Sequence, residues 1–412
     1  MQKTMENRIN AYAKLLVRVG VNVQKGQRMV ISSPVDCAPF ARMCAKAAYD
    51  AGCREVLMNW SDDHMTRERY LRAEPDVFDT FPSWRADFYN MLSEEGAAWL
   101  SIYAEDPETL SGVDADRIRR SSIASGAALK PYRNRQTADF FPWCIASVPT
   151  EAWAKKVFPD KAADGAVDAL WSAILDAVRV KDGGDPVDEW KRHTEMLKKR
   201  VAVLNSHAFR YLKYKNSLGT DLTVELPENH FWEGGSEKSG RGLPFCANMP
   251  TEEVFTAPLR SGTNGVVHAT RPLVVNGDIA DGFSFIFENG KIVNIEAKRG
   301  KKILETAAHL DEGASYLGEV ALVPFDSPIS NSGILFYNTL FDENASCHLA
   351  FGDSYPCIEG GTKMTKDELV AKGLNDSIAH EDFMIGSPDL SITGVTRDGR
   401  EVPVFADGNF AF

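Results

Sequence analysis

Two residues with chemically useful side chains lie close together near the C-terminus: His380 and Asp382, in the stretch IAHEDFMIGS. In a β-strand, positions i and i+2 share a face, so the imidazole and the carboxylate project together while Glu381 projects to the other side. Such a pair has two interpretations. It is either a core histidine held by a neighbouring acid or half of a metal site, and the stretch alone favours the first.

Three further stretches carry acids or a histidine beside apolar runs: Glu252 and Glu253 in NMPTEEVFTAP, Glu319 in LGEVALVP, and His348 in LFDENASCHLAFG. Each has an ordinary explanation by itself, as exposed acids at a strand entrance, a salt bridge at a strand edge, or a satisfied core histidine. Together they are harder to explain, because several unpaired carboxylates and two imidazoles in apolar surroundings would cost much free energy. A divalent cation removes that cost, since it needs anionic oxygens and neutral imidazoles at one place.

The residue types also restrict the metal. Carboxylates with histidines suit zinc, cobalt or manganese. The seven cysteines are scattered and form no C-x-x-C pair, which argues against a disulfide framework and a zinc finger. Because one ion is satisfied by about four ligands, five candidates predict two ions that share a carboxylate, as in aminopeptidases, phosphatases and nucleases. Spacing alone does not distinguish these chemistries. The five candidates are Glu253, Glu319, His348, His380 and Asp382.

The elements that must position these residues fall into two halves. A chain of 412 residues is long for one core and predicts two domains, 1–200 and 201–412. In the first domain, strands alternate with helices, which predicts an α/β scaffold with a mainly parallel sheet. Two helices are expected around the boundary, at about 162–180 and 186–206. The expected strands are 28–32, 55–60, 97–104 and 144–149.

The second domain has a different pattern, with strands separated by tight turns. FSFIFENGKIVNIEAK predicts a hairpin around Asn289-Gly290, and GVTRDGREVPVFADG predicts another around Asp398-Gly399. Helices are few, at 298–309 and 365–372. We therefore expect a C-terminal domain rich in antiparallel strands that carries the metal site.

The composition argues against several other classes. A formal charge of −12 disfavours nucleic acid as a partner. No stretch approaches the roughly 18 apolar residues of a membrane helix, and the N-terminus lacks the pattern of a secretory signal, so we expect a cytoplasmic protein with no membrane partner. No G-x-G-x-x-G motif follows the first strand, which argues against a dinucleotide site. The cluster DDH at 62–64 is interpreted as a solvated turn and helix start.

Five ordered motifs give the chain a family resemblance. PTEEVFTAP, GEVALVP, LFDENASCHLAFG, SYP and HEDFMIG resemble the aminopeptidase T and aminopeptidase S family, the thermophilic-type metallo-aminopeptidases, in order and in separation. The resemblance extends over nearly the whole chain. It implies that the five candidates above are metal ligands, that Glu343 is a further carboxylate tied to the site, and that Tyr355 lies beside the metals. It also implies two divalent ions per chain, peptide substrates and a homodimer.

These observations lead to a functional hypothesis, a metal-dependent aminopeptidase that removes the N-terminal residue of a peptide. Glu319 would bridge the ions, Glu253 or Glu343 would take the proton from the attacking water, and Tyr355 would donate a hydrogen bond to the oxyanion. The alternatives are a metal-dependent hydrolase of another amide and a non-catalytic peptide-binding protein with a structural metal cluster. Six candidate ligands favour catalysis, since a structural site needs only a closed sphere of four ligands.

Overall fold

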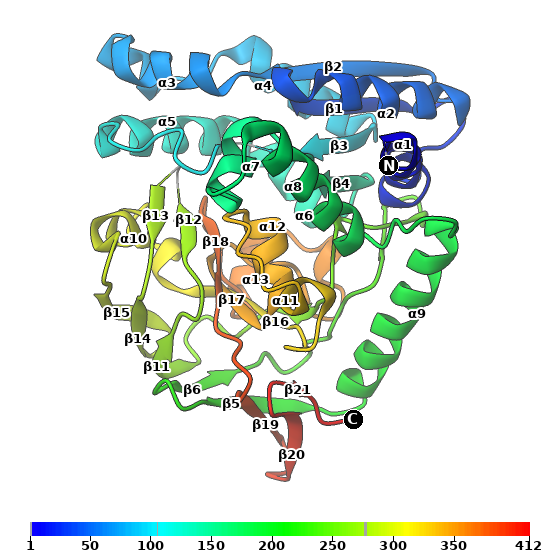
Figure 1. Ribbon diagram of the computed structural model, residues 1–412. Coiled ribbons are helices and arrows are strands. Elements are labelled where there is room, and N and C mark those ends of the chain that lie inside the picture. The colour runs from blue at the N-terminus through cyan, green and yellow to red at the C-terminus, as the bar shows by residue number, and fades with distance from the viewer. Residues whose placement is uncertain (1, 105, 276–277) are drawn as a thin grey trace. The chain divides into compact units, whose positions relative to one another are not determined.

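The structure is a computed structural model that describes residues 2–104, 106–275 and 278–412 (Figure 1). It has a mixed α/β fold with a parallel sheet and a larger antiparallel sheet, as the sequence predicts. Among the helices of these ranges, none combines the length and the apolar character that crossing a membrane requires.

The chain forms two compact units. The first comprises the chain up to Met196 together with Gly235–Thr251, and the second comprises Leu197–Gly234 and Glu252–Phe412. The sequence predicts one boundary at residue 200. The units differ from that prediction in the short segment 235–251, which returns to the first unit.

A five-stranded parallel sheet forms the centre of the first unit, in the order β2-β1-β3-β4-β9. Its apolar runs are buried as expected of a sheet covered on both faces, and Met29, Val30 and Ile31 of the first strand are fully inaccessible. The four strands expected from the sequence are confirmed, the last two being shorter than predicted. They are β1 (Arg28–Pro34), β2 (Glu55–Ser61), β3 (Ala98–Ile102) and β4 (Trp143–Ala146).

The fifth strand, β9 (Asn248–Met249), comes from the returning segment. It pairs with β4 through Ile145 and Ala146, and Met249 is fully buried. A strand of two residues has no periodic pattern, so the sequence does not predict it. The same segment contains a small antiparallel pair, β7 (Glu237–Lys238) and β8 (Pro244–Phe245).

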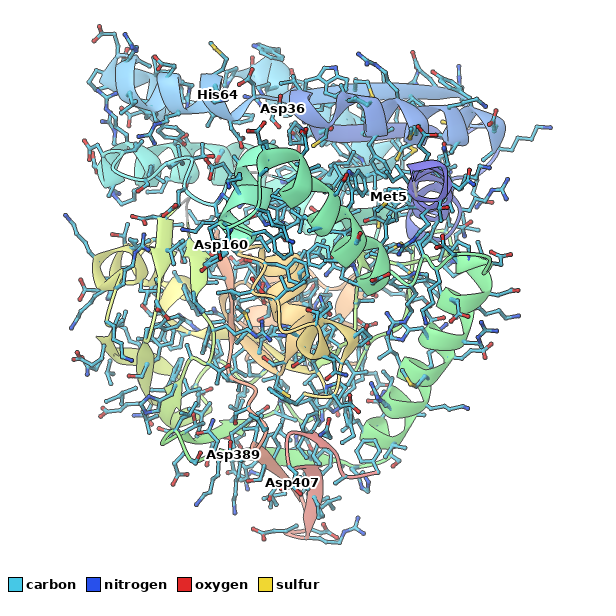
Figure 2. All side chains as sticks on the ribbon, viewed as in Figure 1. Met5, Asp36, His64, Asp160, Asp389 and Asp407 are labelled. Atoms are coloured by element: carbon cyan, nitrogen blue, oxygen red, sulfur yellow. The ribbon has the colours of Figure 1, made fainter. Side chains whose placement is uncertain are left out.

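Helices account for most of the remaining first unit. The DDH cluster begins one of them: the Asp62 side chain accepts a hydrogen bond from the Met65 amide at 3.0 Å, and His64 is exposed in the first turn (Figure 2). The expected helix start is therefore confirmed. The helices are α1 (Gln2–Leu15), α2 (Ala38–Asp50), α3 (Asp63–Arg72), α4 (Ser83–Glu94), α5 (Ala115–Ala128), α6 (Lys130–Thr137), α7 (Glu151–Val157), α8 (Ala163–Ala177) and α9 (Pro186–Asn205), with short helical turns η1 (Leu16–Gly20), η2 (Val35–Cys37) and η3 (Pro75–Asp79). The last helix, α9, passes from the first unit into the second at Leu197.

An eight-stranded antiparallel sheet forms one part of the second unit, in the order β15-β14-β11-β6-β5-β19-β20-β21. Both predicted hairpins are confirmed. At the first, Asn289 and Gly290 have φ values of 50° and 85°, as a type I′ turn requires. The strands are β5 (Phe209–Lys215), β6 (Asp221–Glu225), β11 (Thr263–His268), β14 (Ser284–Glu288), β15 (Lys291–Glu296), β19 (Ser391–Thr396), β20 (Glu401–Ala406) and β21 (Asn409–Phe410).

A separate four-stranded antiparallel sheet has the order β10-β16-β17-β18. One face belongs to the apolar core, because Val320, Leu349 and Phe383 are fully buried in the same cluster as Phe285 of the larger sheet. The other face is therefore the one on which polar side chains can gather. The strands are β10 (Val254–Thr256), β16 (Leu317–Leu322), β17 (His348–Gly352) and β18 (His380–Met384).

The other elements of the second unit are short. The two helices predicted there are confirmed, at 301–308 and 366–371. These two helices are α10 (Lys301–Ala308) and α13 (Lys366–Ala371). The remaining elements are α11 (Pro328–Asn331), α12 (Thr339–Asp342), the strand pair β12 (Leu273–Val275) and β13 (Asp278–Ala280), and the turns η4 (Gly313–Ser315), η5 (Glu343–Ala345) and η6 (Gly361–Lys363).

Candidate metal centre

The register of the four-stranded sheet brings the candidate ligands to one face. Glu319 pairs with Ala350, and Ala350 pairs with Asp382, so the two carboxylates lie in one cross-strand row. His348 pairs with Ala321, two residues after Glu319. Because side chains alternate along a strand and directly paired residues share a face, all of these residues project to the side away from the core.

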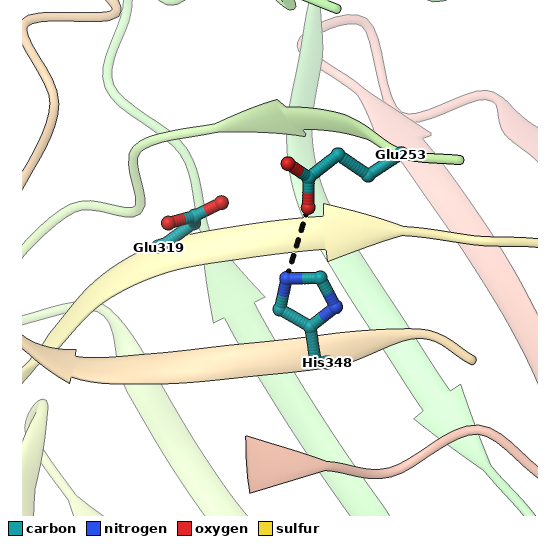
Figure 3. Close-up of side chains that lie close together, drawn as sticks. All are labelled: Glu253, Glu319 and His348. Carbon is teal, nitrogen blue, oxygen red and sulfur yellow. Dashed lines mark ion pairs between the residues drawn. The ribbon is translucent and has the colours of Figure 1, made fainter. Parts of the chain in front are cut away.

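Glu253 and His348 form the first contact of the site (Figure 3). Glu253 immediately precedes β10, and its Oε2 lies 3.1 Å from Nε2 of His348 at the start of β17. Together with Glu319 they form a group whose possible ligand atoms all lie within 4.8 Å of one another. All three residues are buried.

His380 and Asp382 complete a second group with the same glutamate. Nε2 of His380 lies 3.2 Å from Oε2 of Glu319 and 3.6 Å from Oδ1 of Asp382. Their ligand atoms also lie within 4.8 Å of one another. Glu319 therefore belongs to both groups.

The two histidines are oriented in the same way by the backbone. Nδ1 of His348 lies 2.9 Å from the carbonyl oxygen of Glu343, and Nδ1 of His380 lies 2.9 Å from that of Asp353. A carbonyl can only accept, so Nδ1 carries the proton in each ring and Nε2 is directed at the carboxylates. This is the usual arrangement of metal-binding histidines, whose second nitrogen donates to an outer acceptor.

Ala350 occupies the centre of the polar face. It lies between Glu319 and Asp382 in the register, two residues along β17 from His348. A methyl group at this position leaves space between the surrounding carboxylates, where a larger side chain would fill it. The sequence shows the alanine but not its central place, which depends on the pairing of three strands.

The charges of the cluster shift its protonation equilibria strongly. Burial by itself lowers the pKa of His348, but the hydrogen bond to Glu253 and the charges of Glu253, Asp382 and Glu343 raise it to about 10. Burial raises the pKa of Glu319, against the opposing hydrogen bond of His380. In the metal-free chain, protons on the imidazoles thus balance the carboxylates, and cations could take the place of those protons.

Glu343 lies outside the two compact groups, although it is buried beside them. Burial raises its pKa well above the ordinary range, and the negative charges of Asp382 and Glu253 raise it further. Asn344 fixes its surroundings: the amide Nδ2 lies 3.3 Å from Oε1 of Glu343, and Oδ1 accepts from the Glu252 backbone at 2.7 Å. The structure therefore places Glu343 beside both groups, as a further carboxylate of the site.

Tyr355 lies against the site through its ring. The ring packs edge-on against His380 with centroids 5.6 Å apart, and it also contacts Phe255 at 5.2 Å. The structure thus brings Tyr355 to the half of the site formed by His380.

Sequence reasoning missed several supporting residues. The carbonyl that orients His380 belongs to Asp353, whose carboxylate accepts from Nζ of Lys366 at 2.6 and 2.8 Å. Asn344 lies within LFDENASCHLAFG, but nothing in that stretch predicts its contact with the Glu252 backbone. The roles of these residues depend on contacts between separate loops.

Comparison with known proteins gives a consistent result. The profile of the thermophilic metalloprotease family M29 matches residues 5–410. The chain is 46% identical to aminopeptidase AmpS of Bacillus subtilis over 99% of its own length and all of the relative. It is 38% identical to aminopeptidase T of Thermus aquaticus, over 98% of both chains.

Solved structures show the same similarity. Wild-type AmpT from Thermus thermophilus superposes with a TM-score of 0.90 at 36% identity, over 99% of this chain and all of that one. A 2,5-dihydroxypyridine dioxygenase from Pseudomonas putida KT2440 reaches a TM-score of 0.53 at 10% identity, over 100% of this chain and 98% of that one, which shows a shared fold alone.

Proposed function

The chain belongs to the thermophilic metalloprotease family M29 and is a peptidase, and we propose that it is an aminopeptidase whose active site holds two divalent cations. Relatives named as aminopeptidases cover the whole chain, which supports removal of an N-terminal residue from peptides. The single observation that carries the dimetal assignment is the place of Glu319 in both ligand groups.

The residues present fit such a pair of cations. One group offers Glu253, His348 and Glu319, and the other offers Glu319, His380 and Asp382. Each therefore combines carboxylate oxygens with one imidazole nitrogen, a donor set that suits zinc, cobalt or manganese. A glutamate common to both groups is the arrangement expected of a bridging carboxylate in two-metal hydrolases.

Divalent cations in such a pair supply a water that ionises near neutral pH and a polarised scissile carbonyl. Around them, Glu343, a further candidate ligand, is suited to take a proton from the attacking water onto its carboxylate and to pass it to the leaving amine, because burial raises its pKa. Glu253, which we also assign as a ligand, is the second candidate for this proton transfer. The phenol of Tyr355 donates a hydrogen bond to the oxygen of the scissile carbonyl, a role often worth roughly 10²–10³-fold in rate.

Three broader features complete the proposal. The segment 201–412 is the catalytic domain, and the segment 1–200 is its scaffold. The enzyme acts as a homodimer in the cytoplasm on peptide substrates, with no nucleic-acid or membrane partner. The first of these features follows from the site residues, which all lie after residue 252. A molar mass from light scattering tests the dimer directly.

A substrate panel on the purified chain tests the activity. Aminoacyl p-nitroanilides, their N-acetylated counterparts and dipeptides are assayed after exhaustive chelation and after adding back zinc, cobalt or manganese. We expect activity on free-amine substrates only, lost on chelation and restored by metal, with two ions per chain by elemental analysis. Activity that survives thorough chelation would refute the metal dependence, and equal cleavage of N-acetylated substrates would refute the exopeptidase assignment.

A further inference from the structure

Glu233 lies on an additional strand-like segment beside the metal-site sheet. Its backbone amide donates to the Phe255 carbonyl at 2.9 Å, and the Phe255 amide donates back at 2.9 Å, so the two residues form a closed antiparallel bridge. On the outer side of this segment, the Phe231 amide donates to the Cys357 carbonyl at 3.0 Å. The polar face therefore extends beyond β10 by one more chain segment.

Alternation along this segment sends Glu233 to the same side as the metal ligands. Trp232 is 1% exposed and belongs to the apolar core under the opposite face. Its neighbour Glu233 pairs with Phe255, and Phe255 pairs with Ala321 in the row that contains His348. Glu253 is two residues before Phe255 and is a diagonal neighbour of Glu233, at a spacing of about 7–8 Å that long side chains can bridge.

The carboxylate of Glu233 has an unusual environment for a charged group. Its Oε2 accepts a weak hydrogen bond from the Cys357 thiol at 3.8 Å. In the part of the chain that the structure describes, no lysine, arginine or histidine forms an ion pair with it. Burial raises the pKa of Glu233, as expected of a half-buried acid with no cation beside it. Such a group is normally paired.

We infer that Glu233 binds the α-ammonium group of the substrate's N-terminal residue. This inference rests on the proposed aminopeptidase function and adds the residue that selects for a free amine. An ammonium cation provides the charge that the Glu233 environment lacks, and a charge-assisted hydrogen bond forms between them. An N-acetylated terminus is neutral, so it would leave the carboxylate buried without a partner, and such a mismatch discriminates strongly against a ligand.

Paired inhibitors test this role separately from the chemistry of hydrolysis. Leucine hydroxamate and its des-amino analogue, 4-methylpentanohydroxamate, differ only in the amine. Their inhibition constants are measured with the metal-loaded wild type and with Glu233→Gln. We expect the constant for leucine hydroxamate to rise about 10- to 100-fold in the variant, as for loss of one hydrogen bond to a charged group. The constant for the des-amino analogue should change by less than about twofold, with unchanged metal content.

Two further variants control the experiment. Glu359→Gln removes the same charge from an exposed residue of the adjoining loop, and it should leave both constants unchanged. Glu233→Asp keeps the charge on a shorter side chain and should retain part of the preference for the amine, which keeps the test valid if Glu233→Gln folds poorly.

The outcomes separate the two levels of the proposal. A wild type that cleaves free-amine p-nitroanilides, together with Glu233 variants that keep the full preference for leucine hydroxamate, would refute the role of Glu233 alone. A metal-loaded wild type that cleaves none of these substrates would instead refute the aminopeptidase function.

Discussion

The two halves of the candidate metal centre share a glutamate but differ in burial. The half formed by Glu253 and His348 is enclosed, with side-chain exposures of 10% and 1%. The half formed by His380 and Asp382 is more open, at 29% and 15%. The enclosed half is therefore suited to retain an ion, and the open half, beside Tyr355, is suited to meet the substrate.

The two halves also differ in the backbone carbonyl that accepts a hydrogen bond from Nδ1 of each histidine. The acceptor for His348 belongs to the buried turn that carries Glu343 and Asn344. The acceptor for His380 belongs to Asp353, in a loop held by the ion pair with Lys366. The same chemical arrangement thus rests on the packed interior in one half. In the other it rests on a loop residue whose amide donates to the Ala379 carbonyl and whose carboxylate pairs with Lys366.

The largest effect is expected from removing the residue common to both halves. Glu319→Ala should lose both ions and reduce kcat/KM by about 10³-fold or more, because metal stabilisation of the transition state is worth several kcal/mol. Elemental analysis and p-nitroanilide kinetics check this, with circular dichroism to establish that the variant folds. A variant that keeps two ions would show that the halves do not depend on Glu319.

A lower pH should weaken the binding of cations at both halves of the site. The pKa of His348 is about 10 in the metal-free chain and that of His380 is also raised, so cations must displace protons from the imidazoles. Metal affinity should therefore rise with pH, by about tenfold per pH unit for each proton released. Calorimetry in buffers of different ionisation enthalpy counts those protons, and no proton release would contradict the assignment.

The same pKa shift predicts an effect on stability without metal. The pKa of His348 is raised from its ordinary value of 6.5 to about 10 on folding, so its stabilising contribution is complete below 6.5 and is lost as pH rises through 10. The Tm of the metal-free chain should fall across this window. In the metal-loaded chain each imidazole keeps only its Nδ1 proton, because Nε2 faces the cation, and this fall should be absent.

A smaller effect should be confined to the open half. Lys366→Met removes the ammonium group that pairs with Asp353, and with it part of the support for His380. The affinity for one metal ion should therefore fall by about tenfold, in the range typical of outer-sphere residues. Lys363→Met, which changes an exposed lysine in the turn just before α13, is the matched control. An equal loss of affinity for both metal ions in Lys366→Met would show that the two halves are not supported differently.

The smallest expected effect is a difference between the rates at which the two halves release their metal ions. Chelation of the wild type should remove the ions in two phases, because the open half can release its ion after a smaller local opening of the structure. Activity should be lost in the first phase. A difference of about 1.4 kcal/mol in opening free energy separates the phases tenfold. Stopped-flow release into a chromogenic chelator resolves them, and a single phase would indicate that both ions leave together.

The sequence predicts those parts of the molecule whose conformation is determined by residues close together in the chain. The β-branched and apolar runs predict the strands of the parallel sheet, and the Asn289-Gly290 turn predicts its hairpin because both residues adopt positive φ. The period of two around Asp382 correctly predicts that His380 and Asp382 share a face, and the structure shows them converging on Glu319.

What the sequence could not predict depends on contacts between distant segments. The strand β9 has only two residues and is recognised by its pairing with Ile145 and Ala146. The central position of Ala350 requires the register of three strands. Glu233 gave no signal in the sequence, since its relation to the site follows from one bridge to Phe255.

The distribution of the candidate ligands along the chain has a consequence for biosynthesis. The first, Glu253, and the last, Asp382, lie on the two outer elements of one sheet and are far apart in the chain. During translation, the group of Glu319, His380 and Asp382 cannot be completed until the first unit and all four strands of this sheet have been synthesised. Metal loading, and with it the ability to cut peptides, should therefore be a late, post-translational step.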